Sequence, residues 1–350
     1  MVKRIIRMSP AEYINEAGIL NQLPYLLNER GIDRPIILTD EIVLEVIKPF
    51  LPESFLVENP TILFTGNCTF QEVERIEKII TDADALIAFG GGQLVDTAKL
   101  VADNLSIKSV IVQTVPSNCA ALTTKSIVYS EAHEKIANVR HKKAVDLVLL
   151  EPDILKTAPR KYLLSGIGDT LAKFYEIRRR ITKENENLVS AQIGKEYITI
   201  CRREMLKVTD IEALDDLALT NLFDTIFLVA ASVDGILDQD GRSVIAHAFY
   251  NGYVKVKPDY IKTHGEAVAL GSLLQTIIEG ESSAVYRKEI EDYHAKIGLP
   301  LTLKELGLDT DEELDELSNY ISKSNDSRVQ SVFPGLKAHI VREALEEIRG

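Results

Sequence analysis

One aspartate and two histidines, each beside unusual neighbours, are the residues of this sequence best suited to do chemistry together. Asp169 follows two glycines in LLSGIGDTLAKFYE, His247 lies in the apolar run SVIAHAFYNGY, and His264 precedes a helical pattern in IKTHGEAVALG. Zn²⁺ accepts carboxylate oxygen and imidazole nitrogen, and a catalytic zinc site keeps a fourth position open. The three form a candidate metal site, although their spacing does not show that they converge. The alternative is that Asp169 caps a helix and each histidine is structural.

A second candidate site is ALIAFGGGQLVDTAKL, in which an apolar strand runs into three glycines and then into a helix. Gly90, Gly91 and Gly92 let backbone N–H groups approach a diphosphate closely, and the helix N-terminus adds partial positive charge. The segment lacks the spaced GxGxxG fingerprint, so a tight strand-to-helix turn is the alternative. Asp96 and Lys99 lie one turn apart on this helix, where a surface ion pair is the simplest interpretation.

Asp40 ends the apolar run PIILTD, the second strand expected in the chain. A carboxylate at this place can accept both hydroxyls of an adenosine ribose and would repel a 2′-phosphate, which favours NAD over NADP. Aspartate is also a common helix N-cap, so the two interpretations stay open.

Short apolar runs alternate with helical patterns over the first 150 residues. Continuous apolar runs of this kind are typical of strands buried on both faces. They are KRIIRM (3–8), PIILTD (35–40), TILFTG (61–66), ALIAFGGG (85–92), SVIVQTVPS (109–117) and DLVLLEP (146–152). The helical patterns between them cover 19–28, 41–50, 70–81 and 94–104. The alternation predicts a parallel α/β sheet.

The pattern changes at Glu151-Pro152, after which helical periodicity continues without a convincing strand. Helices are expected over 160–181, 187–206, 212–237, 265–278, 283–297, 311–322 and 337–348, with helix-stop residues in the breaks. We therefore predict an α/β domain over residues 1–151 and a helical domain over residues 152–350. A catalytic cleft is expected between the two.

Composition excludes several classes of function. The 350 residues suffice for two domains at roughly 150 residues each. The formal charge is −13 with no basic stripe, which is a poor match for nucleic acid. No run reaches the roughly 18–20 apolar residues that span a bilayer, and the N-terminal residues lack the apolar region of a signal peptide. The 3 cysteines show no CxxC spacing, as expected in a reducing cytoplasm. We expect a cytoplasmic protein with no membrane partner and a small-molecule substrate.

The order of these motifs resembles the group III metal-dependent, iron-containing type alcohol dehydrogenase superfamily. GGGxxxDTAK, GIGDTLAK, HA-xx-NG and THGEAVALG follow one another over nearly the whole chain. The group includes glycerol dehydrogenase, glycerol-1-phosphate dehydrogenase and, more remotely, dehydroquinate synthase. FTGNCTFQEVERI is similar to the glycerol dehydrogenase segment GECxxxEI, with Asn67 in place of the usual Glu. The resemblance implies a dehydroquinate synthase-like fold, with a Rossmann-like sheet domain and an all-helical domain, in a homo-oligomer.

The resemblance also implies roles for individual residues. Asp169, His247 and His264 would bind the catalytic metal, and Asp40 would hold the adenosine ribose of NAD(H). The other residues along the dinucleotide would be Gly90, Gly91, Gly92 and Asp96 at the diphosphate and nicotinamide side, then Thr114, Ser117, Thr123, Lys125 and Tyr129.

Two departures from the family pattern sharpen this expectation. Iron-type enzymes carry a fourth ligand, a histidine, where this chain has Lys173, which offers no lone pair when charged. Zinc is therefore favoured over Fe²⁺ or Ni²⁺. Glycerol dehydrogenases place an aspartate that holds polyol hydroxyls where this chain has Cys119. The CAA-x-T run is instead similar to a bacterial hydroxycarboxylate dehydrogenase-like branch, so Cys119 is a candidate substrate contact, with buried packing as the alternative.

The sequence thus predicts an NAD-dependent, zinc-dependent dehydrogenase of a small polyol or of a 2-hydroxy or 2-oxo acid. One alternative is a glycerol-1-phosphate dehydrogenase-like enzyme, which needs a basic subsite that the sequence does not reveal. Another is a dehydroquinate synthase-type lyase, which uses Glu where Asp169 stands. A third is a dinucleotide-binding sensor without catalysis, which would not need to retain Asp169, His247 and His264.

Overall fold

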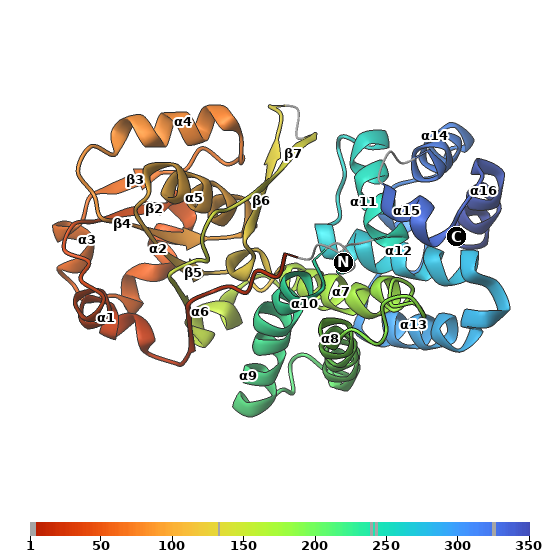
Figure 1. Ribbon diagram of the computed structural model, residues 1–350, viewed down its shortest axis with the longest axis horizontal. Coiled ribbons are helices and arrows are strands. Elements are labelled where there is room, and N and C mark those ends of the chain that lie inside the picture. Colours follow the sequence, from red (N-terminus) through yellow and green to blue (C-terminus); the bar gives the residue numbers. More distant parts are fainter. Residues whose placement is uncertain (1–4, 132–133, 239–240, 242–243, 324–326) are drawn as a thin grey trace. The chain divides into compact units, whose positions relative to one another are not determined.

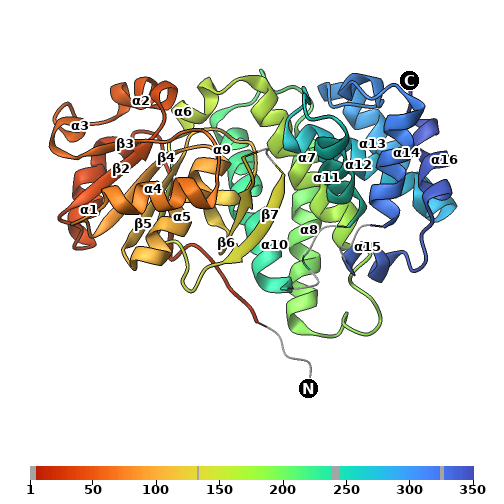
Figure 2. The same ribbon diagram turned by 90° about the horizontal axis from the view of Figure 1, so that it is seen from above.

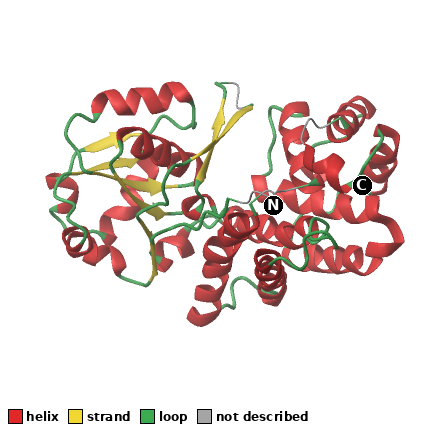
Figure 3. Ribbon diagram, in the orientation of Figure 1, coloured by secondary structure: helices red, strands yellow, loops and turns green. Residues whose placement is uncertain are grey.

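The computed structural model describes residues 5–131, 134–238, 241, 244–323 and 327–350. Residues Arg7–Pro159 form one compact unit, here called the α/β unit. Arg160–Gly350 together with residues 5–6 form a second, here called the helical unit. Figure 3 shows that the described strands all belong to the α/β unit. The domain boundary predicted after residue 151 stays a prediction; helix α6 (Pro152–Thr157) groups with the α/β unit.

Six parallel strands form the sheet of the α/β unit, in the order β1-β8-β5-β4-β2-β3. They are β1 (Glu12–Asn15), β2 (Pro35–Thr39), β3 (Thr61–Leu63), β4 (Ala85–Gly90), β5 (Lys108–Gln113) and β8 (Leu147–Leu150). All residues of β4 and β8 are buried, as expected for a parallel sheet that is covered on both faces. The predicted parallel α/β sheet is therefore confirmed.

Helices cover both faces of this sheet. One face carries α1 (Leu23–Glu29), α2 (Glu41–Ile47), α3 (Phe55–Glu58) and α6, which share a core with inward-facing strand residues such as Phe89 and Val112. The other face carries α4 (Phe70–Ile79) and α5 (Gly92–Leu105), as Figures 1 and 2 show. The predicted helices of this region are confirmed to within a few residues at their ends.

The predicted strands differ from the structure in three places. Strand β1 (Glu12–Asn15) was not predicted. The strand expected over 3–8 is wrong where the structure describes it, because residues 5–8 have no regular structure and Ile5 and Ile6 are exposed. The hairpin of β6 (Lys125–Tyr129) and β7 (Lys135–Arg140), paired antiparallel, was not predicted. Its second strand, KIANVR, has no fully buried residue, so it lacks the apolar signal that identified the central strands.

The helical unit contains ten α-helices among its described residues: α7 (Arg160–Ile177), α8 (Val189–Lys207), α9 (Asp216–Asp224), α10 (Ala230–Leu237), α11 (Ile245–Val256), α12 (His264–Glu279), α13 (Ala284–Ile297), α14 (Asp311–Ser322), α15 (Ser327–Val332) and α16 (Ala338–Glu347). A π-helical segment, Thr225–Val229, joins α9 to α10. Helix α12 is the centre of the unit, because residues 265–276 are all buried and its most extensive contacts are with α7 and α11. Helices α11 and α15 were not predicted.

One helical stretch among the described residues, Asp216–Leu237, is long and apolar enough to cross a membrane by length and composition. Half of its most apolar window is buried inside the structure. A buried core helix passes the same test, so this stretch is weak evidence for a membrane span.

His294 on α13 makes the stability of the helical unit depend on pH. The side chain is buried, its Nδ1 lies 2.9 Å from the carbonyl oxygen of Pro300, and burial lowers its pKa to about 4. In the unfolded chain an imidazole has a pKa of about 6.5. Protons therefore bind the unfolded state preferentially as the pH falls from about 6.5 to about 4.

We expect this histidine to lower the free energy of unfolding by up to about 1.4 kcal/mol per pH unit over that interval. His294→Gln removes the titrating group, so urea unfolding between pH 7 and pH 4 should show a shallower pH dependence than in the wild type. The matched control is His339→Gln, because His339 is exposed in the same unit. Equal pH slopes for wild type and His294→Gln would contradict this prediction.

Candidate functional site

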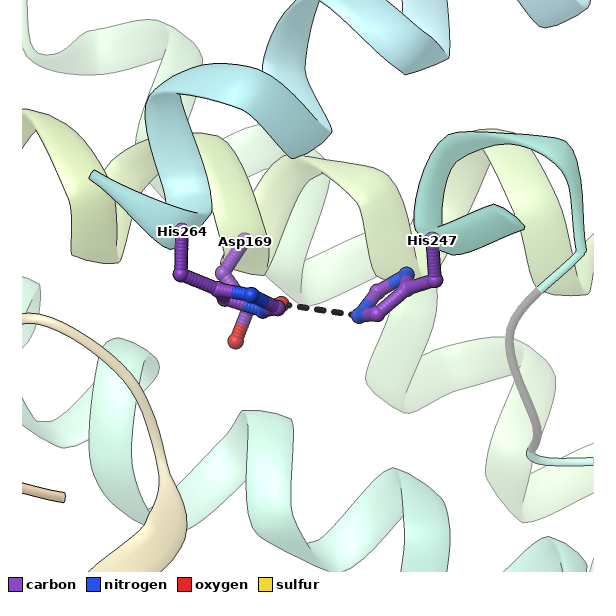
Figure 4. Close-up of side chains that lie close together, drawn as sticks. All are labelled: Asp169, His247 and His264. Carbon is purple, nitrogen blue, oxygen red and sulfur yellow. Dashed lines mark ion pairs between the residues drawn. The ribbon is translucent and has the colours of Figure 1, made fainter. Parts of the chain in front are cut away.

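Asp169, His247 and His264 come together in the helical unit, although 95 residues separate the first from the last. Asp169 lies in the middle of α7, His247 in the first turn of α11 and His264 at the first residue of α12. One ligand atom from each lies within 4.8 Å of the other two. Figure 4 shows both imidazoles turned toward the carboxylate. The interpretation of Asp169 as a helix cap is wrong, because α7 begins nine residues before it.

The Asp169 carboxylate faces two imidazole nitrogens. Its Oδ1 lies 3.3 Å from Nε2 of His247 and 3.6 Å from Nε2 of His264, and it accepts no hydrogen bond of good geometry from the described residues. Burial raises the pKa of Asp169, but Lys173 and the two imidazoles outweigh burial and hold it well below its usual range. One carboxylate oxygen and two imidazole nitrogens are the donor set of a divalent cation such as zinc, iron or nickel. The three residues therefore fit a metal.

The two histidines differ in their surroundings. Burial lowers the pKa of His247, but the carboxylates of Glu176 and Asp169 outweigh burial and raise it. Burial also lowers the pKa of His264. It outweighs the hydrogen bond and the charge of Asp169, so the pKa of His264 is lower than its ordinary value. The ring of Tyr250 meets His264 edge-on, with 4.3 Å between ring centroids, so His264 is held by packing. His247 is held by hydrogen bonds to Glu176, a residue that sequence reasoning missed.

Glu176 lies on the same face of α7 as Asp169, seven residues later. Its Oε2 is 2.7 Å from Nδ1 of His247. The two-turn spacing in DTLAKFYE was the available signal, since residues seven apart share a helix face, but nothing local shows which residue that face meets.

Close approach of two helices brings Asp169 and His264 together. A Cβ on Gly265 would lie 1.7 Å from the carbonyl oxygen of Ser165, and one on Gly168 would lie 2.2 Å from the carbonyl oxygen of Gly265. The N–H of Gly265 donates to Oγ of Ser165 at 2.9 Å. Only glycine at both places lets α12 cross α7 at this distance.

The α/β unit holds the second candidate site. Strands β2 and β4 are adjacent, while β3 follows β2 on one side and β5 follows β4 on the other, so the order of the strands reverses between them. Ligands of such sheets bind outside the carboxyl ends of the strands at this reversal. Asp40 directly follows β2, and Gly91 and Gly92 directly follow β4. The two sequence motifs therefore meet where the fold favours a dinucleotide.

At this edge the glycines lead into helix α5, and Asp40 begins helix α2. Helix α5 begins at Gly92 with no side-chain cap, so its first N–H groups are available to an anion. A Cβ on Gly92 would lie 3.0 Å from the amide of Asn118, and one on Gly91 3.1 Å from Val115. Asp40 caps α2, with Oδ1 accepting from the N–H of Val43 at 2.9 Å. The N-cap interpretation of Asp40 is thus observed, and a second role at a ribose stays a prediction.

Asp96 and Lys99 do not form a surface ion pair, and that expectation is wrong. Their side chains are 9% and 2% exposed, and Nζ of Lys99 lies 2.9 Å from Oδ1 of Asp96. Oδ2 of Asp96 accepts from the N–H of Ile127 at 2.9 Å. Nζ of Lys99 also donates to the carbonyl oxygens of Ala120 and Lys125, at 2.7 and 2.5 Å. The pair therefore fixes the position of strand β6 and of the loop between β5 and β6. Direct cofactor contact by Asp96 stays a prediction.

The remaining residues predicted to contact the dinucleotide or the substrate lie after β5. Thr114 follows the end of β5, and its buried Oγ1 has no hydrogen-bond partner among the described residues. The Thr123 hydroxyl donates to the carbonyl oxygen of Ala120. Ser117 and Cys119 are buried in the loop between these two residues. Lys125 and Tyr129 are the first and last residues of β6. Thr114 is the best placed of the set for an additional polar contact.

Ser126, His141 and Asp103 have the residue types of a hydrolytic triad. Nε2 of His141 lies 2.8 Å from Oγ of Ser126, and Nδ1 lies 3.7 Å from Oδ2 of Asp103. Ser126 is fully buried, and its hydroxyl donates to the carbonyl oxygen of Asp96. Burial and the charge of Lys99 lower the pKa of His141 to about 4. A substrate cannot reach a hydroxyl so enclosed, so this cluster is structural.

Known proteins similar to this chain are dehydrogenases and reductases. The family model described as iron-containing alcohol dehydrogenase matches residues 10–152. Hydroxycarboxylate dehydrogenase A of Escherichia coli is 30% identical over 317 residues, which cover 88% of this chain and 87% of that protein. Glycolaldehyde reductase of Halobacterium salinarum is 29% identical over 318 residues, 88% of this chain and 86% of that protein.

Among solved structures, a probable glycerol dehydrogenase from Sinorhizobium meliloti superposes with a TM-score of 0.83 at 22% identity, covering 99% of this chain and 98% of that one. At this identity the likeness shows the fold alone. The two-domain fold expected from the sequence, with a parallel sheet in one domain and helices in the other, is confirmed.

Gly265→Ala tests whether the crossing of α7 and α12 builds the metal site. The new Cβ would meet backbone atoms of Ser165, which cannot rotate away, so we expect a loss of at least about 3 kcal/mol in unfolding free energy and loss of bound metal. Thermal unfolding and elemental analysis measure the two effects.

Gly194→Ala is the matched control, because the three atoms nearest its Cβ would all belong to the side chain of Leu237 rather than to backbone. This variant should be destabilised less and should keep its metal. If Gly265→Ala kept both wild-type stability and metal content, the close crossing would not be what builds the site.

Proposed function

The chain belongs to the iron-containing alcohol dehydrogenase family, and from this membership we propose that it is an NAD-dependent, zinc-dependent dehydrogenase of a small polyol or of a 2-hydroxy or 2-oxo acid. The observation that carries the proposal is the convergence of Asp169, His247 and His264 from three helices. The chain is thus an oxidoreductase of the alcohol and polyol class, and the identity of its metal and its substrate is what we propose here.

The residues of the helical unit would hold the metal through one carboxylate oxygen and two Nε2 atoms. A divalent cation at this place acts as a Lewis acid that polarises a substrate carbonyl or acidifies a hydroxyl. The chain's own contribution is orientation: Asp169 is kept ionised by Lys173, and both imidazoles are fixed by neighbours on other helices. With three protein ligands, a bound metal would have room for the substrate oxygen.

Lys173 supports zinc over iron. It lies one turn after Asp169 on α7, where a fourth ligand would project toward the same place. A charged ammonium group has no lone pair, so it adds no ligand. Two histidines and a carboxylate are a ligand set of catalytic zinc and also of non-haem iron, so the preference for zinc rests on Lys173.

The α/β unit supports NAD(H) as the redox partner. The uncapped N-terminus of α5, the glycines before it and the carboxylate of Asp40 occupy the edge of the sheet where dinucleotides bind. A carboxylate beside the adenosine ribose would repel the 2′-phosphate of NADP, so NAD is favoured.

Cys119 supports an acid or aldehyde over glycerol as the substrate. The thiol is a weak donor and a weak acceptor, so it cannot replace the aspartate that would hold polyol hydroxyls. The names of two relatives, hydroxycarboxylate dehydrogenase A and glycolaldehyde reductase, agree with this preference. Substrate contact by Cys119, the predicted cleft between domains, the homo-oligomer and the absence of nucleic-acid and membrane partners all stay predictions.

The metal site is tested by removing its ligands. His264→Ala and Asp169→Asn should each lower kcat/KM by at least about 100-fold, because removing even a residue that only hydrogen-bonds to a metal ligand costs roughly 10- to 100-fold. Zinc content should fall in parallel. The measurements are elemental analysis and NADH consumption with 2-oxo acids, glycolaldehyde, dihydroxyacetone and dihydroxyacetone phosphate.

His339→Ala, at an exposed histidine of the same unit, is the control and should keep metal and activity. Full metal content and full activity in both ligand variants would show that the metal site is wrong. A clear preference for dihydroxyacetone phosphate would instead favour the phospho-polyol alternative.

Asp40→Ser tests the choice of nucleotide. Serine is as good a helix N-cap as aspartate, so α2 should keep its cap while the negative charge disappears. Because an unfavourable pair of like charges costs several kcal/mol, we expect the ratio of kcat/KM for NAD over NADP to fall at least about tenfold.

Asp215→Ser is the matched control, since Asp215 caps α9 in the same way, accepting from the N–H of Ala218 at 2.8 Å. An unchanged nucleotide preference in Asp40→Ser would remove the argument that this carboxylate selects NAD.

A further inference from the structure

The first turn of α11, which carries His247, is capped by side chains from other helices. Its N-cap residue, Val244, provides no side-chain cap. The N–H of Val244 donates to Oε1 of Glu176 at 2.6 Å, and the N–H of His247 donates to the same oxygen at 3.2 Å. The N–H of Ile245 donates to Oε1 of Gln275 at 3.2 Å. The position of α11 therefore depends on one carboxylate from α7 and one amide from α12.

Glu176 makes a third contact that a helix cap does not require. Its Oε2 lies 2.7 Å from Nδ1 of His247, while Nε2 on the other side of the ring faces Asp169. Glu176 is 1% exposed, so this carboxylate has little access to water and depends on these three donors. An ionised carboxylate only accepts hydrogen bonds, so Nδ1 must carry the proton.

We propose that Glu176 is a positioning residue that fixes His247 as the Nδ1–H tautomer, which leaves the lone pair on Nε2 for the metal. The inference rests on the proposed function for the identity of the bound group, a divalent cation. Carboxylates that accept from the second nitrogen of a metal-bound histidine orient the ring and raise its basicity. In this chain the same carboxylate also fixes the backbone from which the ring projects, so side chain and helix are set by one group.

Glu176→Gln separates the two roles of the residue. The glutamine oxygen can still accept from the N–H groups of Val244 and His247, so the cap of α11 is kept. The glutamine NH₂ then faces Nδ1, which must become an acceptor, and the proton moves to Nε2. The substitution therefore favours the tautomer that cannot bind metal through Nε2, with almost no change in volume.

Gln275→Ala is the matched control for the capping role alone. Gln275 caps Ile245, and its Nε2 donates to the carbonyl oxygen of Tyr175 at 2.7 Å. Its removal should destabilise the start of α11 without changing the hydrogen bond at Nδ1 of His247. Glu176→Ala removes both roles and should combine lower stability with weaker metal binding.

The experiment uses the full chain and two readouts that do not depend on activity. Zinc affinity is measured by competition with a chelating dye, and thermal unfolding is recorded for each variant. ¹⁵N NMR of the imidazoles in the metal-free chain, at a pH where they are neutral, reports the tautomer of His247, which His247→Gln identifies by loss of its signals.

We expect the Nδ1–H tautomer in the wild type and zinc binding about 10- to 100-fold weaker in Glu176→Gln, with near wild-type unfolding. Gln275→Ala should keep zinc affinity within a few-fold while unfolding at a lower temperature. The inference is overturned if wild-type His247 is the Nε2–H tautomer, if Glu176→Gln binds zinc as the wild type does, or if Gln275→Ala loses as much affinity as Glu176→Gln. Failure of the wild type to bind zinc would refute the proposed function, and the tautomer of His247 would still decide the inference.

Discussion

Burying a carboxylate costs several kcal/mol unless opposite charges or hydrogen bonds surround it, and α7 buries two on one face, Asp169 and Glu176. Each must be matched by groups from elsewhere in the chain. His247 contacts both, with one ring nitrogen turned to each carboxylate. The start of α11 is therefore held in place by the buried carboxylates of α7, and the same contacts orient His247 toward the proposed metal site.

The α/β unit also buries a charged group, in this case the positively charged Lys99. Lys99 is buried on α5, and its ammonium group is surrounded by Asp96 and by carbonyl oxygens of the segment after β5. Because these acceptors come from residues 120–125, the cation fixes the loop that carries Cys119 and Thr123 as well as the start of β6. A single buried charge thus links the helix that follows the glycines to the loop where substrate and nucleotide contacts are predicted.

These buried charges also explain where sequence reasoning succeeded and where it failed. The central strands and most helices could be predicted because apolar periodicity is a local property, and it matched β4, β8 and α14 closely. Asp169, His247 and His264 could be proposed because their neighbours are unusual for a helix core. The role of Glu176 and the burial of the Asp96–Lys99 pair could not be predicted, since a charged residue is expected to be exposed unless the groups that surround it are known. Those groups lie on other elements: α11 around Glu176, and residues 120–127 around the pair. The strand expected over 3–8 failed for the converse reason: among its described residues, the apolar side chains of Ile5, Ile6 and Met8 are all exposed, although an apolar run is expected to be buried.

Three residues of α7 that lie about one turn apart, Asp169, Lys173 and Glu176, have different roles. Asp169 offers an oxygen, Lys173 keeps it ionised, and Glu176 holds the ring opposite. A lysine at the middle position lowers the attraction of the site for a dication, because its charge opposes that of the metal. It also ensures that Asp169 needs no deprotonation when a metal binds, since its pKa is already far below neutral. At the proposed metal site the chain would therefore lack a fourth ligand and some electrostatic affinity, and would retain an ionised donor and room for a substrate. Such a balance would suit a catalytic metal, which needs an open position, more than a structural metal, whose positions are all filled by protein ligands.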